Sequence, residues 1–441
     1  MADRPNIIQI TTHDSGRHFG CYGHPTLHTP NVDRLASEGV KLTNHFGTVP
    51  ICSASRASQL TGLYPQTNGL LHLCFGPNAY HIRDNVPHMA NLLKAAGYRT
   101  HLIGMQHETA DLERLEFDSI RSERGNKVVG KHVYRYRTAD ETDEEAAKFL
   151  RNEASVEQPF YMQTGFFETH TYNGKFDFGG VEPDASKGVE VPPYVADTSM
   201  SQAAMAGYQG AVRKADAAVG VILDALRDSG LEENTVFVFT TDHGIEVPRA
   251  KWHLYDPGVG IACVIRYPAG GIAGGRDNGL LLSNVDYLPT MLTLAGLETP
   301  EHVQGLSFAH TLTEEGPAPV REAIYGMFHA TNSRFVRTNR YKLIRNFQGA
   351  SRHLHLPATY EDLLTKDLCH PVELYDLEAD PLEFNDIARK PENAAVVARL
   401  DDMLWTWLES QDDPLLKGPI RWPAYERTMA EYEEWRRRTK G

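Results

Sequence analysis

Short apolar runs alternate with longer helical patterns through residues 6–241, and this alternation constrains the fold more than any other feature. Strands that alternate with helices build sheets with helices on both faces. The sequence therefore predicts a large α/β layer, and it places a further helix start at Thr29, as N-cap, and Pro30. The predicted strands are residues 6–12, 42–47, 98–104, 160–167 and 235–241, and the predicted helices are 53–61, 90–96 and 203–228.

Four of these strands end in polar segments that could carry chemistry. The segments are His13-Asp14, Met105-Gln106-His107, Glu168-Thr169-His170 and Asp242-His243-Gly244. Open α/β sheets bind their ligands just beyond the carboxyl ends of the strands. We therefore expect the four segments to meet at one edge of the sheet and to form a site there.

The composition changes near residue 320. Four short strands, at residues 323–327, 334–338, 341–345 and 372–377, precede an amphipathic helix at 394–409. This pattern predicts a small antiparallel sheet with a packing helix, in which Trp405 and Trp407 serve the core. We predict two domains, at residues 1–319 and 320–441. The charged segment 426–440 reads as a helix that could serve assembly into a homo-oligomer.

Composition excludes several partners. The 441 residues carry a net charge of −14, which argues against nucleic acid, and no apolar run is long enough for a membrane span. The N-terminus enters the first strand without an apolar leader, so we expect no secretory signal. Five cysteines without framework spacing favour the reducing cytoplasm over a disulfide scaffold.

The segment Cys52-Ser53-Ala54-Ser55-Arg56, followed by Ala57-Ser58-Gln59-Leu60-Thr61-Gly62, carries the most specific signal. A small buried cysteine in a core turn is the alternative for an isolated Cys-x-x-x-Arg. With its downstream residues the segment resembles the signature of the type I sulfatases of the alkaline phosphatase superfamily. The resemblance implies a large mixed sheet between helices and a C-terminal four-stranded antiparallel sheet.

The resemblance also implies the chemistry of residue 52. A formylglycine-generating enzyme would oxidise Cys52 to formylglycine, whose hydrated aldehyde attacks sulfur with one hydroxyl and expels sulfate with the other. The helix predicted behind Cys52 would direct free N–H groups toward the nucleophile and a bound oxyanion. The expected substrate is a small sulfated or phosphorylated molecule.

Two strand ends match the family's metal-binding segments. Asp14, Asp242 and His243 fit, together with the residue formed from Cys52, whereas His13 replaces the usual aspartate. We expect one divalent cation. Calcium comes first by resemblance, and the softer nitrogen of His13 brings manganese or zinc close behind. The alternative for His13 is a residue that only makes hydrogen bonds.

The remaining catalytic positions match the family with one departure. By resemblance, Arg56 supports the nucleophile and the metal-side carboxylates, and His107 orients the nucleophile or takes its proton. The family's lysine two residues before that histidine is Met105 here, and methionine carries no charge. Lys251, Arg249 or protonated His253 could replace that cation.

Two more residues are expected to contact the substrate. By resemblance, His170 protonates the leaving group, and Lys251 binds the sulfate, with His253 as a second candidate for substrate binding. The segment 175–193 could be a loop over the site or a plain surface insertion. His72, His81 and His88 could line a pocket, although we favour ordinary surface positions.

Within the family the chain resembles N-sulfoglucosamine sulfohydrolases and related bacterial sulfatases. Segments that carry this likeness are Gln66-Thr67-Asn68-Gly69, Tyr98–Gly104 and Glu373–Leu377. The resemblance implies a hydrolase that cleaves sulfate esters or sulfamates, with a sulfated sugar as the family-level substrate. Met105 and His13 keep open the hydrolysis of phosphonate or phosphate mono- or diesters. A non-catalytic binding protein derived from a sulfatase is the third alternative.

Overall fold

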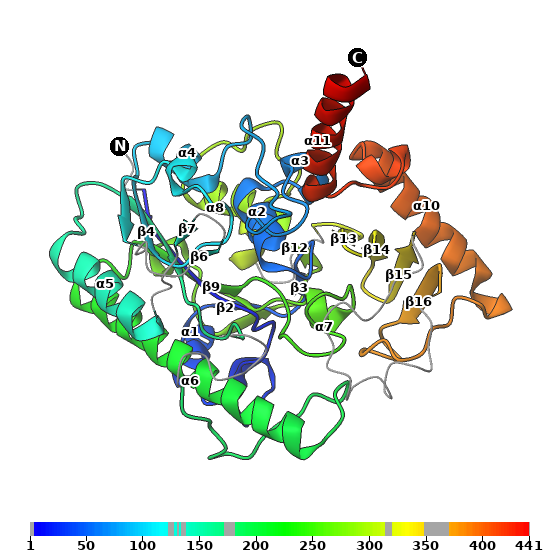
Figure 1. Ribbon diagram of the computed structural model, residues 1–441. Helices are drawn as coiled ribbons and strands as arrows, with labels where there is room; N and C mark the ends of the chain where they lie inside the picture. Colours follow the sequence, from blue (N-terminus) through cyan, green and yellow to red (C-terminus); the bar gives the residue numbers. More distant parts are fainter. Residues whose placement is uncertain are drawn as a thin grey trace.

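The computed structural model describes residues 4–121, 128–129, 132–133, 138–171, 181–313, 320–347 and 370–440. An eight-stranded mixed sheet forms its centre, in the order β11-β2-β10-β9-β1-β8-β4-β5 (Figure 1). The predicted mixed sheet is thereby confirmed. Its strands are β1 (Asn6–Thr12), β2 (Val40–Leu42), β4 (Arg99–Gly104), β5 (Ser119–Arg121), β8 (Phe160–Gly165), β9 (Thr235–Thr241), β10 (Cys263–Arg266) and β11 (Arg276–Asn278).

Parallel pairing aligns the ends of the central strands. β1 runs parallel to β9 and β8, with Thr12 opposite Thr241 and Thr11 opposite Gly165. β4 runs parallel to β8, with Gly104 opposite Gly165. All four carboxyl ends therefore lie at one edge of the sheet, as the sequence predicts.

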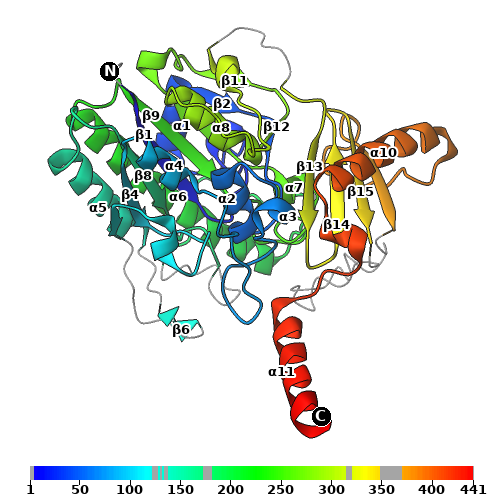
Figure 2. The ribbon, with the colours of Figure 1, turned by 90° about the horizontal axis from the view of Figure 1, so that it is seen from above.

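Helices cover both faces of this sheet, and successive residues of β1 pack into cores on opposite faces. Ile8 and Ile10 of β1 share a core with α1, α5 and α6, whereas Ile7 shares a core with α4 and α8. α2 and α7 lie nearer the second sheet (Figures 1 and 2). The bounds are α1 (Pro30–Glu38), α2 (Cys52–Thr61), α3 (Pro65–Asn68), α4 (Met89–Ala95), α5 (Ala139–Asn152), α6 (Ser199–Asp228), α7 (Asp256–Val259) and α8 (Tyr287–Leu294).

The C-terminal part forms the predicted four-stranded antiparallel sheet. Its strands are β13 (Ile324–Phe328), β14 (Ser333–Arg337), β15 (Tyr341–Asn346) and β16 (Val372–Asp376). One face of this sheet packs on α10 (Ala394–Ser410), and the other packs on the core cluster that contains Cys52. The second sheet therefore supports the segment that carries the candidate nucleophile. The domain boundary at 319/320 stays a prediction, and residues 314–319 lie outside the described ranges.

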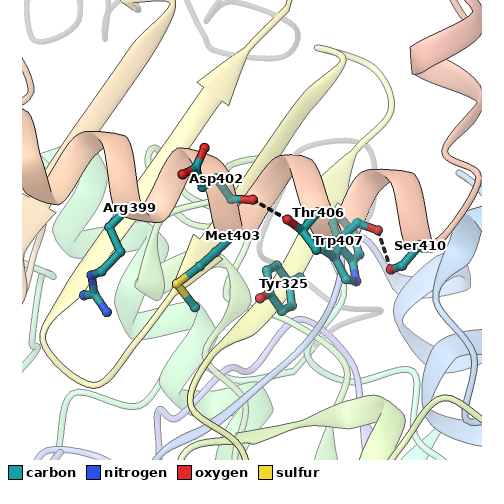
Figure 3. A pocket seen from close by; sticks show the side chains of 7 residues that line it. All are labelled: Tyr325, Arg399, Asp402, Met403, Thr406, Trp407 and Ser410. Carbon is teal, nitrogen blue, oxygen red and sulfur yellow. Dashed lines mark hydrogen bonds between the residues drawn. The ribbon is translucent and has the colours of Figure 1, made fainter.

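Trp407 confirms the expected packing role. It is 6% exposed, and Tyr325 of β13 stacks on its ring at a centroid distance of 5.0 Å. Both residues line a shallow pocket of about 490 Å³ on α10 (Figure 3). Trp405 is only partly buried and donates a hydrogen bond to Asp401.

The last helix, α11 (Pro423–Lys440), projects away from the rest of the chain (Figures 1 and 2). It exposes the aromatic side chains of Tyr432 and Trp435. Its role in assembly stays a prediction. In the part of the chain that the structure describes, no helix is long and apolar enough to cross a lipid bilayer.

One local expectation is wrong, and a second is confirmed in its position but not in its hydrogen bond. The strand predicted at 42–47 is interrupted, because the chain leaves the large sheet after β2 and then pairs β3 (His45–Phe46) with β12 (Leu282–Ser283). Thr29 is the N-cap residue of α1, but its hydroxyl donates to Asp33 instead of accepting from the helix. The carboxylate of Asp216 accepts the N–H groups of Asn31 and Val32 in its place. A cap from a distant helix leaves no local sequence signal.

A minor ladder joins β6 (Val128–Val129) and β7 (His132–Val133).

Candidate active site

Helix α2 carries Cys52 at its first position, against the end of β9. Ser55 of this helix donates a hydrogen bond of 2.6 Å to the carbonyl of Asp242, and Asn284 donates to the carbonyl of Ser55 at 2.9 Å. Cys52 itself is 2% exposed. The unpaired N–H groups of the first turn thus lie beside the strand ends, where they favour a bound anion.

Four buried residues from two strand ends form a compact group, which we call the Asp–His cluster: His13, Asp14, Asp242 and His243. One ring nitrogen or carboxylate oxygen of each residue lies within 4.8 Å of the corresponding atoms of the other three. Nδ1 of His13 is 2.5 Å from Oδ1 of Asp14, and Nε2 of His243 is 3.1 Å from that oxygen. The backbone supports this arrangement, since the N–H of Asp14 donates to Oδ1 of Asp242 at 3.0 Å.

A glycine permits the close approach at the end of β9. A Cβ atom on Gly244 would lie 1.9 Å from the carbonyl oxygen of Pro257, at the start of α7. Gly104, at the end of β4, has a φ of 80°, and a Cβ atom there would lie 2.4 Å from the carbonyl oxygen of Gly165. Only glycine fits both positions, which explains its place in the two segments.

The carboxylates of the Asp–His cluster are ionised. Burial opposes their charge, but Lys251 and His13 hold the pKa of Asp14 well below its usual range. The pKa of Asp242 is lowered by His243, His13 and Arg56 against the same opposition. Burial is likewise outweighed at His243, where Asp242 and Asp14 raise the pKa to about 10.

This donor set fits a divalent cation. Two ionised carboxylates and two imidazoles surround one buried space, and each of the four side chains can offer one donor atom to an ion held between them. Mixed nitrogen and oxygen donors of this kind suit first-row transition metals and zinc. Four of the five residues predicted to bind the metal are therefore brought together in this cluster. The fifth, Cys52, lies in a second group with His13 and His107, and the metal-binding role of all five stays a prediction.

Each carboxylate also has one fixed cation. Nε of Arg56 donates to Oδ2 of Asp242 at 3.0 Å, and Nζ of Lys251 donates to Oδ2 of Asp14 at 2.7 Å. Both cationic side chains are nearly fully buried. Arg249, expected as a replacement cation, donates instead to the carbonyls of Leu382 and Glu383. It therefore binds the C-terminal part of the chain.

His107 lies against the candidate nucleophile. Its Nδ1 is 3.4 Å from Sγ of Cys52 and 3.0 Å from Nε2 of His13. Burial raises the pKa of Cys52, but His107 and hydrogen bonds from His13 and His243 outweigh it and hold the pKa well below the usual value. Burial lowers the pKa of His107. A neutral imidazole beside residue 52 can accept a proton from it.

The position of the missing family lysine is buried. Met105 is 2% exposed and directly follows Gly104 at the end of β4. A thioether offers neither charge nor a donor there. Among the described residues, Lys251 is the lysine that contacts the Asp–His cluster, through Asp14.

The two further histidines differ in their surroundings. The ring centroids of His170 and His13 are 4.5 Å apart, and Nδ1 of His170 is 2.5 Å from the carbonyl oxygen of Thr171. Burial, followed by Lys251, lowers the pKa of His170 to about 3, so Nδ1 carries the proton and Nε2 is an acceptor. His253 contacts the carbonyl of Lys251 through Nδ1 at 3.0 Å and stacks on Tyr255. Their predicted roles at the substrate stay predictions.

Two carboxylates near the site escaped the sequence analysis. Glu246 lies 3.3 Å from Nζ of Lys251 and accepts a hydrogen bond from Thr171. Glu108 is 1% exposed and accepts from Gln163, and burial raises its pKa against the attraction of Arg56. The sequence signal that could have identified both carboxylates is an acidic residue close to a predicted strand-end segment.

The surface position that we favoured for His88 is wrong. His88 is buried, and its side chain accepts a hydrogen bond from the N–H of Ala90 at the start of α4.

The loop expected over the site is described only in part. Residues 172–180 lie outside the described ranges, and residues 181–193 form no helix. Gln209 of α6 holds the described part, since its side chain donates to the carbonyls of Asp184 and Gly188. Whether 175–193 covers the site stays a prediction.

Comparison with known proteins supplies the family. Residues 5–297 match the family described as Sulfatase, and residues 249–410 match the family described as N-sulphoglucosamine sulphohydrolase, C-terminal. Human N-sulphoglucosamine sulphohydrolase is 28% identical, over 94% of this chain and 92% of its own length. An ulvan-active sulfatase of Formosa agariphila is 29% identical, over 96% and 84%.

Solved structures share the fold. One protein, solved in complex with its substrate D-glucosamine-2-N,6-O-disulfate, matches with a TM-score of 0.72 at 23% identity, over 94% of this chain and 99% of its own. Another, from work on the metabolism of multiple glycosaminoglycans by Bacteroides thetaiotaomicron, matches with a TM-score of 0.74 at 23% identity, over 93% and 97%.

Proposed function

Because the chain belongs to the sulfatase family and is a sulfuric ester hydrolase, we propose that it cleaves sulfate esters or sulfamates of a sulfated sugar with a nucleophile made from Cys52. One observation carries this proposal. Cys52 lies at the N-terminus of α2 with His107 at 3.4 Å, next to a buried donor set that fits a divalent cation. The sugar is supported by relatives named for N-sulphoglucosamine and ulvan.

The proposal requires two groups in addition to the unmodified side chains, a modified residue 52 and a divalent cation. Formylglycine formed from Cys52 would supply a hydrated aldehyde, with one hydroxyl for attack and a second for sulfate release. A divalent cation would be held by the Asp–His cluster and would supply positive charge that favours the ionised nucleophile. Two imidazoles among four donors favour manganese or zinc, whereas calcium, first by resemblance, prefers oxygen donors alone.

The side chains of this site divide the remaining work. Nδ1 of His107 accepts the proton of residue 52, and Arg56 keeps Asp242 oriented toward the Asp–His cluster. Lys251 holds a positive charge next to His170, where the sulfate group would lie. A preorganised cation of this kind stabilises charge that develops in the transition state. His170 offers Nε2 toward the leaving group, and it must first gain a proton to act as an acid.

The test is turnover by protein produced together with a formylglycine-generating enzyme. The substrates are N-sulfoglucosamine, 6-O-sulfated glucosamine and an aryl sulfate. We expect Cys52→Ala to abolish sulfate release, whereas Cys263→Ala, a change at another buried cysteine in β10, keeps it. Equal turnover by Cys52→Ala would refute the proposed nucleophile. No turnover of any substrate by the unchanged protein would favour a non-catalytic binding role.

A second candidate is hydrolysis of phosphonate or phosphate esters at the same site. Met105 favours it, because the family's lysine is absent from a buried position. Aryl phosphonate esters matched to the aryl sulfate separate the two. A preference for the phosphonate by orders of magnitude in kcat/KM would replace the first proposal with the second.

A further inference from the structure

We propose that Glu246 makes the anion pocket select substrates whose reacting group carries one negative charge over those that carry two. This inference rests on the proposed function, because it places the substrate anion at Lys251 and His170. Glu246 lies in the segment after β9, between the Asp–His cluster and Lys251 in the chain. It would act as a specificity-determining residue.

The contacts of Lys251 place Glu246 at the pocket. Nζ of Lys251 lies 2.7 Å from Oδ2 of Asp14 and 3.3 Å from Oε2 of Glu246. The carboxylates of Asp14 and Glu246 and a ring nitrogen of His170 all lie within 4.8 Å of one another. An anion that contacts Lys251 and His170 therefore lies within a few ångströms of the Glu246 carboxylate.

Thr171 fixes the Glu246 side chain in this position. Its hydroxyl donates to the same carboxylate oxygen that faces Lys251, and its carbonyl oxygen accepts from Nδ1 of His170. The side chain of Glu246 is 28% exposed, so its charge is only partly screened by water. The negative charge is thus held beside the anion position.

The charge balance of the pocket gives this carboxylate its effect. Arg56 and Lys251 are the fixed cations that contact the described carboxylates of the cluster, and each is already paired with one of them. Glu246 adds a carboxylate, and Met105 adds no cation. The repulsion between the Glu246 carboxylate and a bound anion grows with the charge of that anion, so a group with two negative charges is held less favourably than a group with one.

Substrate groups differ in this property. Sulfate esters, sulfamates and phosphonate monoesters carry one charge, whereas a phosphate monoester carries two above its second pKa of about 6. Two unit charges about 5 Å apart repel by an amount that corresponds to roughly tenfold in an equilibrium constant when the effective dielectric constant is about 50, between the value of water and that of a buried site. The extra charge of a phosphate monoester therefore meets roughly a tenfold penalty from Glu246 alone.

The test compares three aryl substrates with one leaving group: a sulfate, a methylphosphonate monoester and a phosphate monoester. We measure kcat/KM at about pH 8, where the phosphate is doubly charged, for the unchanged holoenzyme and for Glu246→Gln. The glutamine keeps the shape and an acceptor oxygen but removes the charge. We expect the ratio of phosphate to phosphonate turnover to rise roughly tenfold, and the ratio of sulfate to phosphonate to stay constant.

Glu232→Gln is the matched control. Glu232 is also a partly buried, ion-paired carboxylate, but it pairs with Arg266 near the opposite end of β9. We expect this variant to leave all ratios unchanged. Equal loss for all three substrates in Glu246→Gln would show that Glu246 only orders Lys251, and would overturn the inference. Absence of sulfate turnover in the unchanged enzyme would instead refute the proposed function. The ratio of phosphate to phosphonate turnover would still test the charge effect of Glu246, so the two failures can be told apart.

Discussion

Replacement of Lys251 by methionine tests the cation on which the proposed chemistry depends. Nζ of Lys251 is 2.7 Å from Asp14, and the side chain is 3% exposed. Methionine has a similar length and no charge, so the change isolates the electrostatic contribution. Loss of one preorganised group that stabilises transition-state charge costs about 3–4 kcal/mol, or roughly 10²–10³-fold in kcat. We expect Lys251→Met to lose sulfatase activity by this factor.

The same change has a cost in stability that must be measured separately. Removal of one partner of a buried ion pair costs about 3–5 kcal/mol, because the other charge stays buried. Asp14 keeps His243 at 3.1 Å and His13 at 2.5 Å, so we expect a decrease in the free energy of unfolding at the lower end of this range. Urea titration gives this value at the pH of the activity assay.

Lys251→Arg is the control, because it keeps the charge and changes the shape. We expect arginine to retain more than ten times the kcat/KM of methionine, about 1.4 kcal/mol of transition-state stabilisation. If both variants lose activity equally while they remain folded, the charge of Lys251 is not what the reaction needs. Lys251 would then contribute through its shape and position alone.

Three further predictions test separate parts of the structure. Chelation should abolish turnover and lower the melting temperature, and manganese or zinc should restore both better than calcium, as assayed by activity and calorimetry. Burial and Asp140 raise the pKa of Asp143 to about 7, so ionisation of this residue lowers the stability of the protein as pH rises from about 4 to about 7. Asp143→Asn should therefore increase the free energy of unfolding by about 2–4 kcal/mol at about pH 8 and by little below about pH 4. Equal effects in urea titrations at both pH values would contradict this. Arg334→Met should lower the free energy of unfolding by about 3–5 kcal/mol, because it removes the cation paired with the fully buried carboxylate of Asp413, and a change below about 1 kcal/mol would contradict this.

The sequence predicts that the candidate site residues lie close together, because the order and direction of the strands determine where their ends lie. His13-Asp14 and Asp242-His243 each directly follow a buried strand, and parallel pairing with Thr12 opposite Thr241 brings them to one edge. The same reasoning places His107 and His170 near them. Local rules of strand and helix formation were sufficient here, since each segment directly follows the element that positions it.

Contacts between distant side chains could not be predicted in this way. The pairing of Glu246 with Lys251 depends on the path of the loop between them, and nothing local marks it. The cap that Asp216 provides to α1 joins residues far apart in the chain. Arg249 was an equally good candidate cation in the sequence, and only the packing of the C-terminal segment takes it away.

Support of the nucleophile by the second sheet is a further example. Phe335 of β14 and Ile344 of β15 share one hydrophobic core with Ile51 and Cys52. Large-to-small changes in such a core cost about 2–5 kcal/mol. The C-terminal sheet therefore contributes to the position of the reactive residue as well as to overall stability.

The most direct measurement of the central claim is the mass of the tryptic peptide 42–56, which contains residue 52, from protein produced together with a formylglycine-generating enzyme. We expect the mass of the aldehyde or its hydrate in place of the cysteine thiol. An unmodified thiol at residue 52, in protein that nevertheless releases sulfate from its substrate, would refute the formylglycine nucleophile.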